Sequence, residues 1–216
     1  MFTLETPGEI GLQPFLEQFR TDPGGREPDA LIRVDEAGKN YLLTADLLGK
    51  YGLRRRMLEK GLFVLHASYI VHEGCGILFS GASGIGKSFQ AGLWERCRGA
   101  RIVNGDRVLI EERDGRFTAN GIFYCGSSGI CENVTTPLKA VVILERGAST
   151  VRRPVGIEAF KALLPQCAYD VNDPREVESV TRLLADLIGC TPVYVLSAAP
   201  DESSVIALEN AMEGET

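Results

Sequence analysis

Residues 79–88 read FSGASGIGKS, a short apolar stretch followed by a glycine-rich turn and the start of a helical pattern. Within this segment, residues 81–88 match the phosphate-loop pattern G-x-x-x-x-G-K-[ST] at every fixed position. The glycines allow positive φ angles, so that consecutive backbone N–H groups can point at one anion. Lys87 would reach the outer phosphates as a cation, and the Ser88 hydroxyl would ligate a Mg²⁺ ion that bridges phosphate oxygens. The segment therefore predicts a strand, a phosphate-binding loop and a helix.

The whole loop is expected to contribute to phosphate binding, through its backbone N–H groups and two side chains. These residues are Gly81, Ala82, Ser83, Gly84, Ile85, Gly86, Lys87 and Ser88. The surroundings fit this interpretation, since an apolar run at 76–80 precedes the loop. Phe89, Leu93 and Cys97, with Trp94, predict the inward stripe of the helix that follows. The alternative is a glycine-rich strand-to-helix turn that binds nothing.

Composition limits the class of protein. The 216 residues are enough for one domain, which we divide into a small N-terminal extension at 1–61, with a hairpin and a helix, and a core at 62–216. The net charge of -6 argues against nucleic-acid or anionic-membrane partners, which select basic surfaces. No apolar run approaches the ~20 residues of a membrane span, and no secretory signal is visible at Met1–Glu5. With six cysteines in no C-x-x-C pair and only two histidines, we expect a cytoplasmic protein with reduced thiols and no zinc site.

The chain before and after the loop shows alternating strand and helix patterns. Residues 62–71 and 76–80 predict an antiparallel hairpin that leads into the loop, while 101–103 and 108–110 predict strands around the turn 104–107. Asp114-Gly115 predicts a hairpin turn. Further strands are expected at 30–34, 41–43, 116–119, 122–124, 137–144 and 192–196, and helices at 46–60, 157–164, 173–189 and 201–212.

Phosphoryl transfer needs a carboxylate near the loop, either to hold Mg²⁺ or to accept a proton from the attacking hydroxyl. Asp106 is the candidate, because the helix and the return strand can bring it back beside the phosphates. His66 lies on the strand expected to pair with the strand before the loop, and it is a candidate contact to the transferring phosphate. The alternatives are an Asp in a Gly-Asp turn and a core histidine. The polar loop at 126–133 is expected to shape the acceptor side.

Several of these segments, taken in order, are familiar as a set. His66-Ala67-Ser68, the loop at 79–88, Asn104-Gly105-Asp106-Arg107, Cys125–Gly129 and Pro137–Ala140 follow one another along the chain. This order resembles the HPr kinase / phosphoenolpyruvate carboxykinase-like superfamily, in particular its short stand-alone members, over about residues 62–200.

The resemblance implies an α/β fold of the phosphoenolpyruvate carboxykinase-like type, a mixed sheet with flanking helices and a phosphate loop. It also implies ATP-dependent, Mg²⁺-assisted phosphorylation of a hydroxyl, usually a serine of a protein, of a peptide or of free serine. Lys87 and Ser88 match the phosphate and metal positions of the family, Asp106 its base or metal-binding carboxylate, and His66 its active-site histidine.

The chain also departs from the family pattern. HPr kinases commonly carry two adjacent acids where this chain has Gly105-Asp106, so Glu132 is considered as a second acid. Phe89 stands where small or acidic residues are common, and the later hallmark loop is not recognisable, so HPr itself is not the expected acceptor.

Three functions remain open at this point. The first is a kinase that acts on an unidentified serine-bearing acceptor, with ATP, another nucleotide or pyrophosphate as donor. The second is a nucleotide-binding regulatory or partner-docking protein without transfer activity, a reading favoured by the missing second acid. The third is an ordinary phosphate-loop hydrolase on a parallel sheet, which the antiparallel hairpin before the loop disfavours. Self-association into a homo-oligomer is left open by the sequence.

Overall fold

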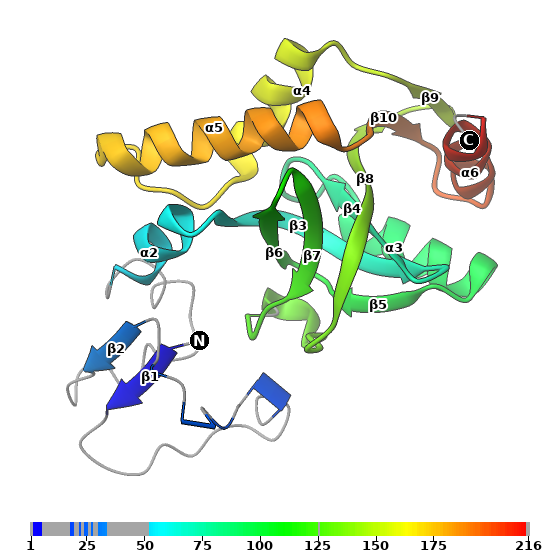
Figure 1. The fold of residues 1–216 in the computed structure, drawn as a ribbon. Coiled ribbons are helices and arrows are strands. Elements are labelled where there is room, and N and C mark those ends of the chain that lie inside the picture. Colours follow the sequence, from blue (N-terminus) through cyan, green and yellow to red (C-terminus); the bar gives the residue numbers. More distant parts are fainter. Residues whose placement is uncertain are drawn as a thin grey trace.

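A computed structural model of the chain describes residues 2–5, 18–19, 22, 24–25, 27, 30–33, 52–124 and 126–214. A mixed eight-stranded sheet forms its centre (Figure 1). The hydrogen-bonded order is β4 (Cys75–Ser80), β3 (Leu62–His72), β6 (Arg107–Arg113), β7 (Arg116–Gly121), β8 (Thr135–Arg146), β10 (Val193–Ala198) and β9 (Thr150–Arg152), and β5 (Arg101–Asn104) pairs with β3.

The β4 strand is paired on both sides, with β3 and with β8. Its pairing with β8 is parallel, as is that of β8 with β10, whereas the remaining pairings of this sheet are antiparallel. The strand that leads into the loop is therefore one arm of an antiparallel hairpin, as its sequence predicts. The all-parallel sheet of an ordinary phosphate-loop hydrolase is excluded by this pairing.

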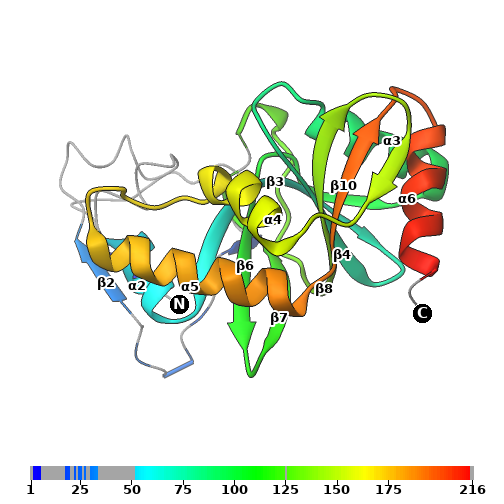
Figure 2. The ribbon, with the colours of Figure 1, turned by 90° about the horizontal axis from the view of Figure 1, so that it is seen from above.

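Helices cover both faces of the sheet (Figures 1 and 2). One core cluster joins the strands to α2 (Leu53–Glu59), α4 (Gly156–Leu163) and α5 (Pro174–Cys190). The other joins them to α3 (Lys87–Arg98) and α6 (Ser203–Glu213). The division follows from the two-residue period of a strand.

In β8 this period is visible residue by residue. Val141 and Ile143 belong to the first cluster, while Ala140, Val142 and Leu144 belong to the second. The central part of the strand, residues 140–144, is therefore apolar at every position, because both of its faces are covered by helices.

Several predicted elements are confirmed at residue level. The hairpin turn at 114–115 has positive φ at both residues, 52° and 72°, and Asp173 caps α5 by accepting a hydrogen bond from the Arg175 backbone N–H. The strands predicted at 116–119, 137–144 and 192–196 and the helices at 157–164 and 201–212 are present as β7, β8, β10, α4 and α6.

The helix predicted at 173–189 is present as α5, which extends one residue past Gly189 to Cys190. Two predictions are wrong. Residues 122–124 form no strand; instead, two of their carbonyls accept hydrogen bonds from a buried side chain described below. Phe89 does not belong to the inward stripe of α3, since 49% of its surface is exposed.

Less of the N-terminal extension is described. β1 (Phe2–Glu5) pairs in parallel with β2 (Ala30–Arg33), and the predicted partner strand at 41–43 lies outside the described residues. The predicted helix at 46–60 is described from Gly52 onward, where Gly52 has a φ of 64° and α2 begins after it. In the part of the chain that is described, no helix combines the length and the apolar character needed to cross a bilayer.

Candidate functional site

The phosphate-loop pattern forms the connection between the end of β4 and the start of α3. Gly81, Gly84 and Gly86 have φ angles of 144°, 74° and 115°, which side chains rarely allow. Gly86 is also the N-cap residue of α3, and it offers no side chain to the N–H groups of the first helical turn. These donors, with the positive end of the helix dipole, form the kind of site that binds phosphate.

Lys87 lies inside this loop and is only 7% exposed. Its Nζ donates hydrogen bonds to the carbonyl oxygens of Gly81 (3.0 Å) and Ala82 (3.2 Å). Burial lowers the pKa of Lys87, and the negative charge of Asp106 counteracts that shift. The lysine thus carries its charge at the centre of the loop, with two carbonyls that phosphate oxygens could replace.

Asp106 lies opposite Ala67 of β3, whose N–H donates to the Asp106 carbonyl at 3.0 Å. Its Oδ1 is 3.3 Å from Nε2 of His66, and its Oδ2 is 3.4 Å from Nε of Arg107. The hydrogen bond from His66 lowers the pKa of Asp106, and the charges of His66, Arg107 and Lys87 lower it further against the opposing effect of burial. Asp106 is therefore held as a carboxylate.

The buried side chain of Asn104 fixes the turn that carries Asp106. Its Oδ1 accepts hydrogen bonds from the N–H groups of Asp106 (2.9 Å) and Arg107 (3.0 Å). Its Nδ2 donates to the carbonyl oxygens of Ile122 (3.1 Å) and Tyr124 (2.9 Å). The sequence patterns that point to Asp106 assign no role to Asn104, although Asn before Gly-Asp is typical of a turn in which the side chain accepts a hydrogen bond from the backbone N–H two residues on.

Gly105 is where the loop and the Asp106 turn meet. Its carbonyl oxygen accepts hydrogen bonds from Oγ of Ser68 (3.0 Å) and from Oγ of Ser88 (3.4 Å). A Cβ at Gly105 would lie 2.5 Å from Oγ of Ser128, so the position has no room for a side chain. This close packing gives a physical reason for the single acid, because a carboxylate at Gly105 would require the 126–128 turn to move.

The short helix η3 (Gly126–Ser128) packs directly on Asp106. Gly126 has a φ of 55°, and a Cβ there would lie 2.7 Å from Cγ of Asp106. The structure therefore places the first part of the predicted 126–133 loop against Asp106. Arg107 continues this cluster, since its guanidinium lies 5.1 Å from the ring centroid of Tyr124.

The other charged candidates are placed differently. Glu132, considered as a second acid, forms an ion pair with Arg101 at 2.6 Å, at the opposite end of β5 from the Asp106 turn. Arg146 donates to the Gly84 carbonyl at 3.3 Å and so reaches the loop from the end of β8.

A bound Mg²⁺ would find two oxygen-bearing side chains here, Ser88 and Asp106, on either side of Gly105. No group of three or more His, Cys, Asp or Glu side chains suited to a metal occurs among the described residues. This donor set fits Mg²⁺, which commonly takes one or two protein ligands and completes its shell with phosphate oxygens and water.

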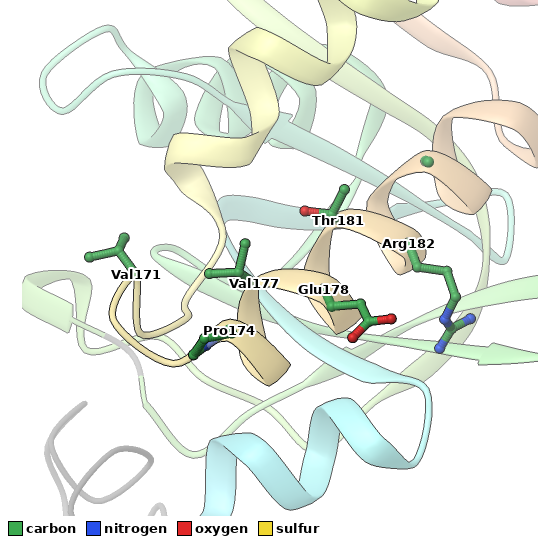
Figure 3. A pocket seen from close by; sticks show the side chains of 7 residues that line it. Val171, Pro174, Val177, Glu178, Thr181 and Arg182 are labelled. Atoms are coloured by element: carbon green, nitrogen blue, oxygen red, sulfur yellow. The ribbon is translucent and has the colours of Figure 1, made fainter.

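The described surface includes a larger and a smaller hollow. The larger, about 720 Å³, is an open groove along α5, where Figure 3 shows the apolar Val171, Pro174 and Val177 together with the polar Glu178, Thr181 and Arg182. The smaller, about 350 Å³, adjoins the phosphate loop and reaches from Ile85 and Phe89 to Pro200. Of these two, the smaller one borders the candidate site.

Comparisons with known proteins add a distant structural match. No family model matches the sequence, and no curated protein matches it. Among solved structures, the Hpr(Ser) kinase/phosphatase from Coxiella burnetii is similar with a TM-score of 0.40 and 13% sequence identity. The match covers 71% of this chain and 99% of that chain. These values indicate a distant structural relationship.

Proposed function

We propose that the protein is an ATP-dependent, Mg²⁺-assisted phosphotransferase that phosphorylates a hydroxyl, most simply a serine of a protein, a peptide or free serine. One observation carries the proposal: Gly105 joins the phosphate loop to the Asp106–His66 pair. Ser88 contacts the Gly105 carbonyl at 3.4 Å, and Asp106 is the next residue in the same turn. A carboxylate thus stands beside the end of the loop where the outer phosphates would lie.

Each of these residues would have a separate role in the transfer. The N–H groups of the loop and Lys87 would bind the phosphates and balance their charge, and Ser88 and Asp106 would hold Mg²⁺, which would supply further positive charge to the transferring phosphate. Asp106 also orients the acceptor hydroxyl, and His66 keeps Asp106 in place through the 3.3 Å contact. The hydroxyl oxygen forms a bond to the terminal phosphorus as the bond to the leaving diphosphate oxygen breaks. The hydroxyl proton passes to Asp106 and from there to solvent.

The test combines binding with transfer. Mg²⁺–ATP binding is measured by calorimetry for the wild type and Lys87→Ala, which should bind at least about tenfold more weakly because a buried cation is lost. Transfer of label from [γ-³²P]ATP is then followed with free L-serine, serine-containing peptides and water as acceptors. Asp106→Asn should lower the rate by about a hundredfold or more.

A matched control is available at Asp114. Asp114→Asn also removes one carboxylate, but it lies in the β6–β7 hairpin turn, where Asn is equally suited to the positive φ of 52°. This variant should transfer label as the wild type does. Equal rates for Asp106→Asn and the wild type would refute the assigned role of Asp106.

The second candidate function is nucleotide-dependent regulation without transfer. It is favoured by the contacts of both Asp106 oxygens with cationic or hydrogen-bonding neighbours, and by the absence of space for a second acid at Gly105. Tight Mg²⁺–ATP binding, combined with no release of label to any acceptor or to water, would favour this function over the kinase.

A further inference from the structure

The order of the strands places different groups of residues on the two sides of the phosphate loop. β4 lies between β3 and β8, and the loop leaves its carboxyl end. On the β3 side stand His66 and the Asp106 turn. On the other side, the ends of β8 and β10 form the 350 Å³ cavity with the loop and the first turn of α3. The candidate chemistry and the cavity therefore lie on opposite sides of the loop.

A bound triphosphate has a direction along this loop. Lys87 and Ser88 are the residues that such loops direct to the outer phosphates and their metal ion, and Ser88 contacts the carbonyl next to Asp106. The terminal phosphate would accordingly point toward Asp106. The first phosphate, which carries the nucleoside, would then point away from Asp106, toward the start of α3 and the cavity.

The cavity is lined mainly by apolar groups, including Ile85, Leu144 and Pro200. Phe89 also lines it and is 49% exposed, which is unusual for an aromatic residue. The guanidinium of Arg96 lies 6.0 Å from the Phe89 ring centroid. A half-exposed ring at the mouth of an apolar cavity is suited to stacking against a planar base.

We propose that this cavity holds the nucleoside of the bound nucleotide, with the base stacked on Phe89. The inference rests on the proposed function for the identity of the ligand, but it concerns different residues. At about 350 Å³ the cavity lies at the small end of the range for small-molecule sites, which suits one nucleoside.

The same lining predicts little discrimination between bases. Its two long polar side chains already have partners: Gln90 exchanges hydrogen bonds with Ser204 at 3.1 and 3.2 Å, and Arg146 donates to Gly84. A site that reads a base needs side-chain donors and acceptors aimed at its edge. Stacking alone accepts any base, because every base has a π face. The protein should therefore bind ATP and GTP within about fivefold of each other.

The experiment compares three ligands, each with Mg²⁺: ATP, GTP and inorganic tripolyphosphate. Binding to the wild type, Phe89→Ala and Ile206→Ala is measured by calorimetry. Ile206 provides the control, since it is a large apolar residue of α6 with 43% exposure. Phe89→Ala should weaken ATP and GTP binding by about ten- to a hundredfold and leave tripolyphosphate binding unchanged, while Ile206→Ala changes none of the three.

Other outcomes would overturn the proposal, and they are distinguishable from failure of the proposed function. Equal wild-type affinity for ATP and tripolyphosphate would show that no nucleoside site exists, while leaving the phosphate loop intact. Unchanged ATP binding in Phe89→Ala would exclude the stacking. Failure of the wild type to bind any of the three ligands, or binding that Lys87→Ala does not weaken, would instead refute the phosphate site and the nucleoside site together.

Discussion

Replacing Asn104 with alanine should be among the most damaging single changes near the candidate site. The side chain is fully buried and makes four hydrogen bonds of 2.9–3.1 Å, two to backbone N–H groups and two to carbonyl oxygens. At about 1 kcal/mol for each hydrogen bond, the loss comes to about 4 kcal/mol. The two N–H groups and two carbonyl oxygens would also lose their hydrogen-bond partner and would need water in its place. Since small domains are stable by only about 5–15 kcal/mol, this is a large fraction of the total.

Urea unfolding followed by circular dichroism measures this loss, and Asn120→Ala is the matched control. The Asn120 side chain also makes four hydrogen bonds, with Leu109, Thr118 and Thr135, but it is only half-buried. Because water can replace its partners, the loss of this side chain should cost only about 1 kcal/mol. If Asn104 acts by positioning Asp106, a second result is expected. Asn104→Ala should bind ATP in the absence of Mg²⁺ nearly as the wild type does, because Lys87 and the N–H groups of the loop are untouched. With Mg²⁺ it should transfer label more slowly, because the Asp106 turn is loosened. If Asn104→Ala is no less stable than Asn120→Ala, the account of the turn is refuted.

Three further predictions concern packing and charge. Gly126→Ala should lose at least about 1 kcal/mol more stability in urea than Gly129→Ala, because both glycines have positive φ (55° and 67°) but only a Cβ at Gly126 would meet Asp106. The lowered pKa of Asp106 stabilises the fold above the pKa of an unfolded aspartate, about 4, and this contribution is lost as the pH falls through the lower folded value. The stability advantage of the wild type over Asp106→Asn should therefore shrink between about pH 5 and pH 2, and an advantage independent of pH would contradict the assignment. Arg54→Ala should destabilise the protein by about 2–3 kcal/mol in thermal or urea unfolding, because it removes the 2.6 Å partner of the buried Glu176 carboxylate, and a loss below about 0.5 kcal/mol would count against that pair.

The parts of the site that depend on short stretches of sequence could be predicted. The glycines at 81, 84 and 86 do have the positive φ angles that the loop pattern requires, and the hairpin before the loop brings Ala67 opposite Ser80. That pairing puts His66 and the Asp106 turn beside the loop. In each case a local pattern determines the geometry, since turn residues and strand periods act over a few positions.

The features that were missed depend on contacts between distant segments. Nothing in the helical period around Phe89 reveals that the ends of β8 and β10 leave a cavity beside it, because that cavity is formed by residues more than fifty positions away. The contact of Gly126 with Asp106 likewise requires β7 and β8 to place the intervening segment over the β5–β6 turn. Tertiary packing decides such positions, and it overrides the local preference of the sequence.

The packing around Asp106 also bears on how a phosphotransferase could work with a single acid. The carboxylate is held ionised by His66, Arg107 and Lys87, which makes it a weak base. Phosphoryl transfer through a loose transition state needs little base strength, because the acceptor hydroxyl loses its proton late and most of the catalysis comes from positioning and charge balance. A weakly basic carboxylate fixed within about half an ångström by Asn104, His66 and the 126–128 turn would suit that task better than a mobile strong base. A second acid at Gly105 would displace the turn that fixes Asp106, and the proposed chemistry would lose more from poorer positioning than it gained from an added charge.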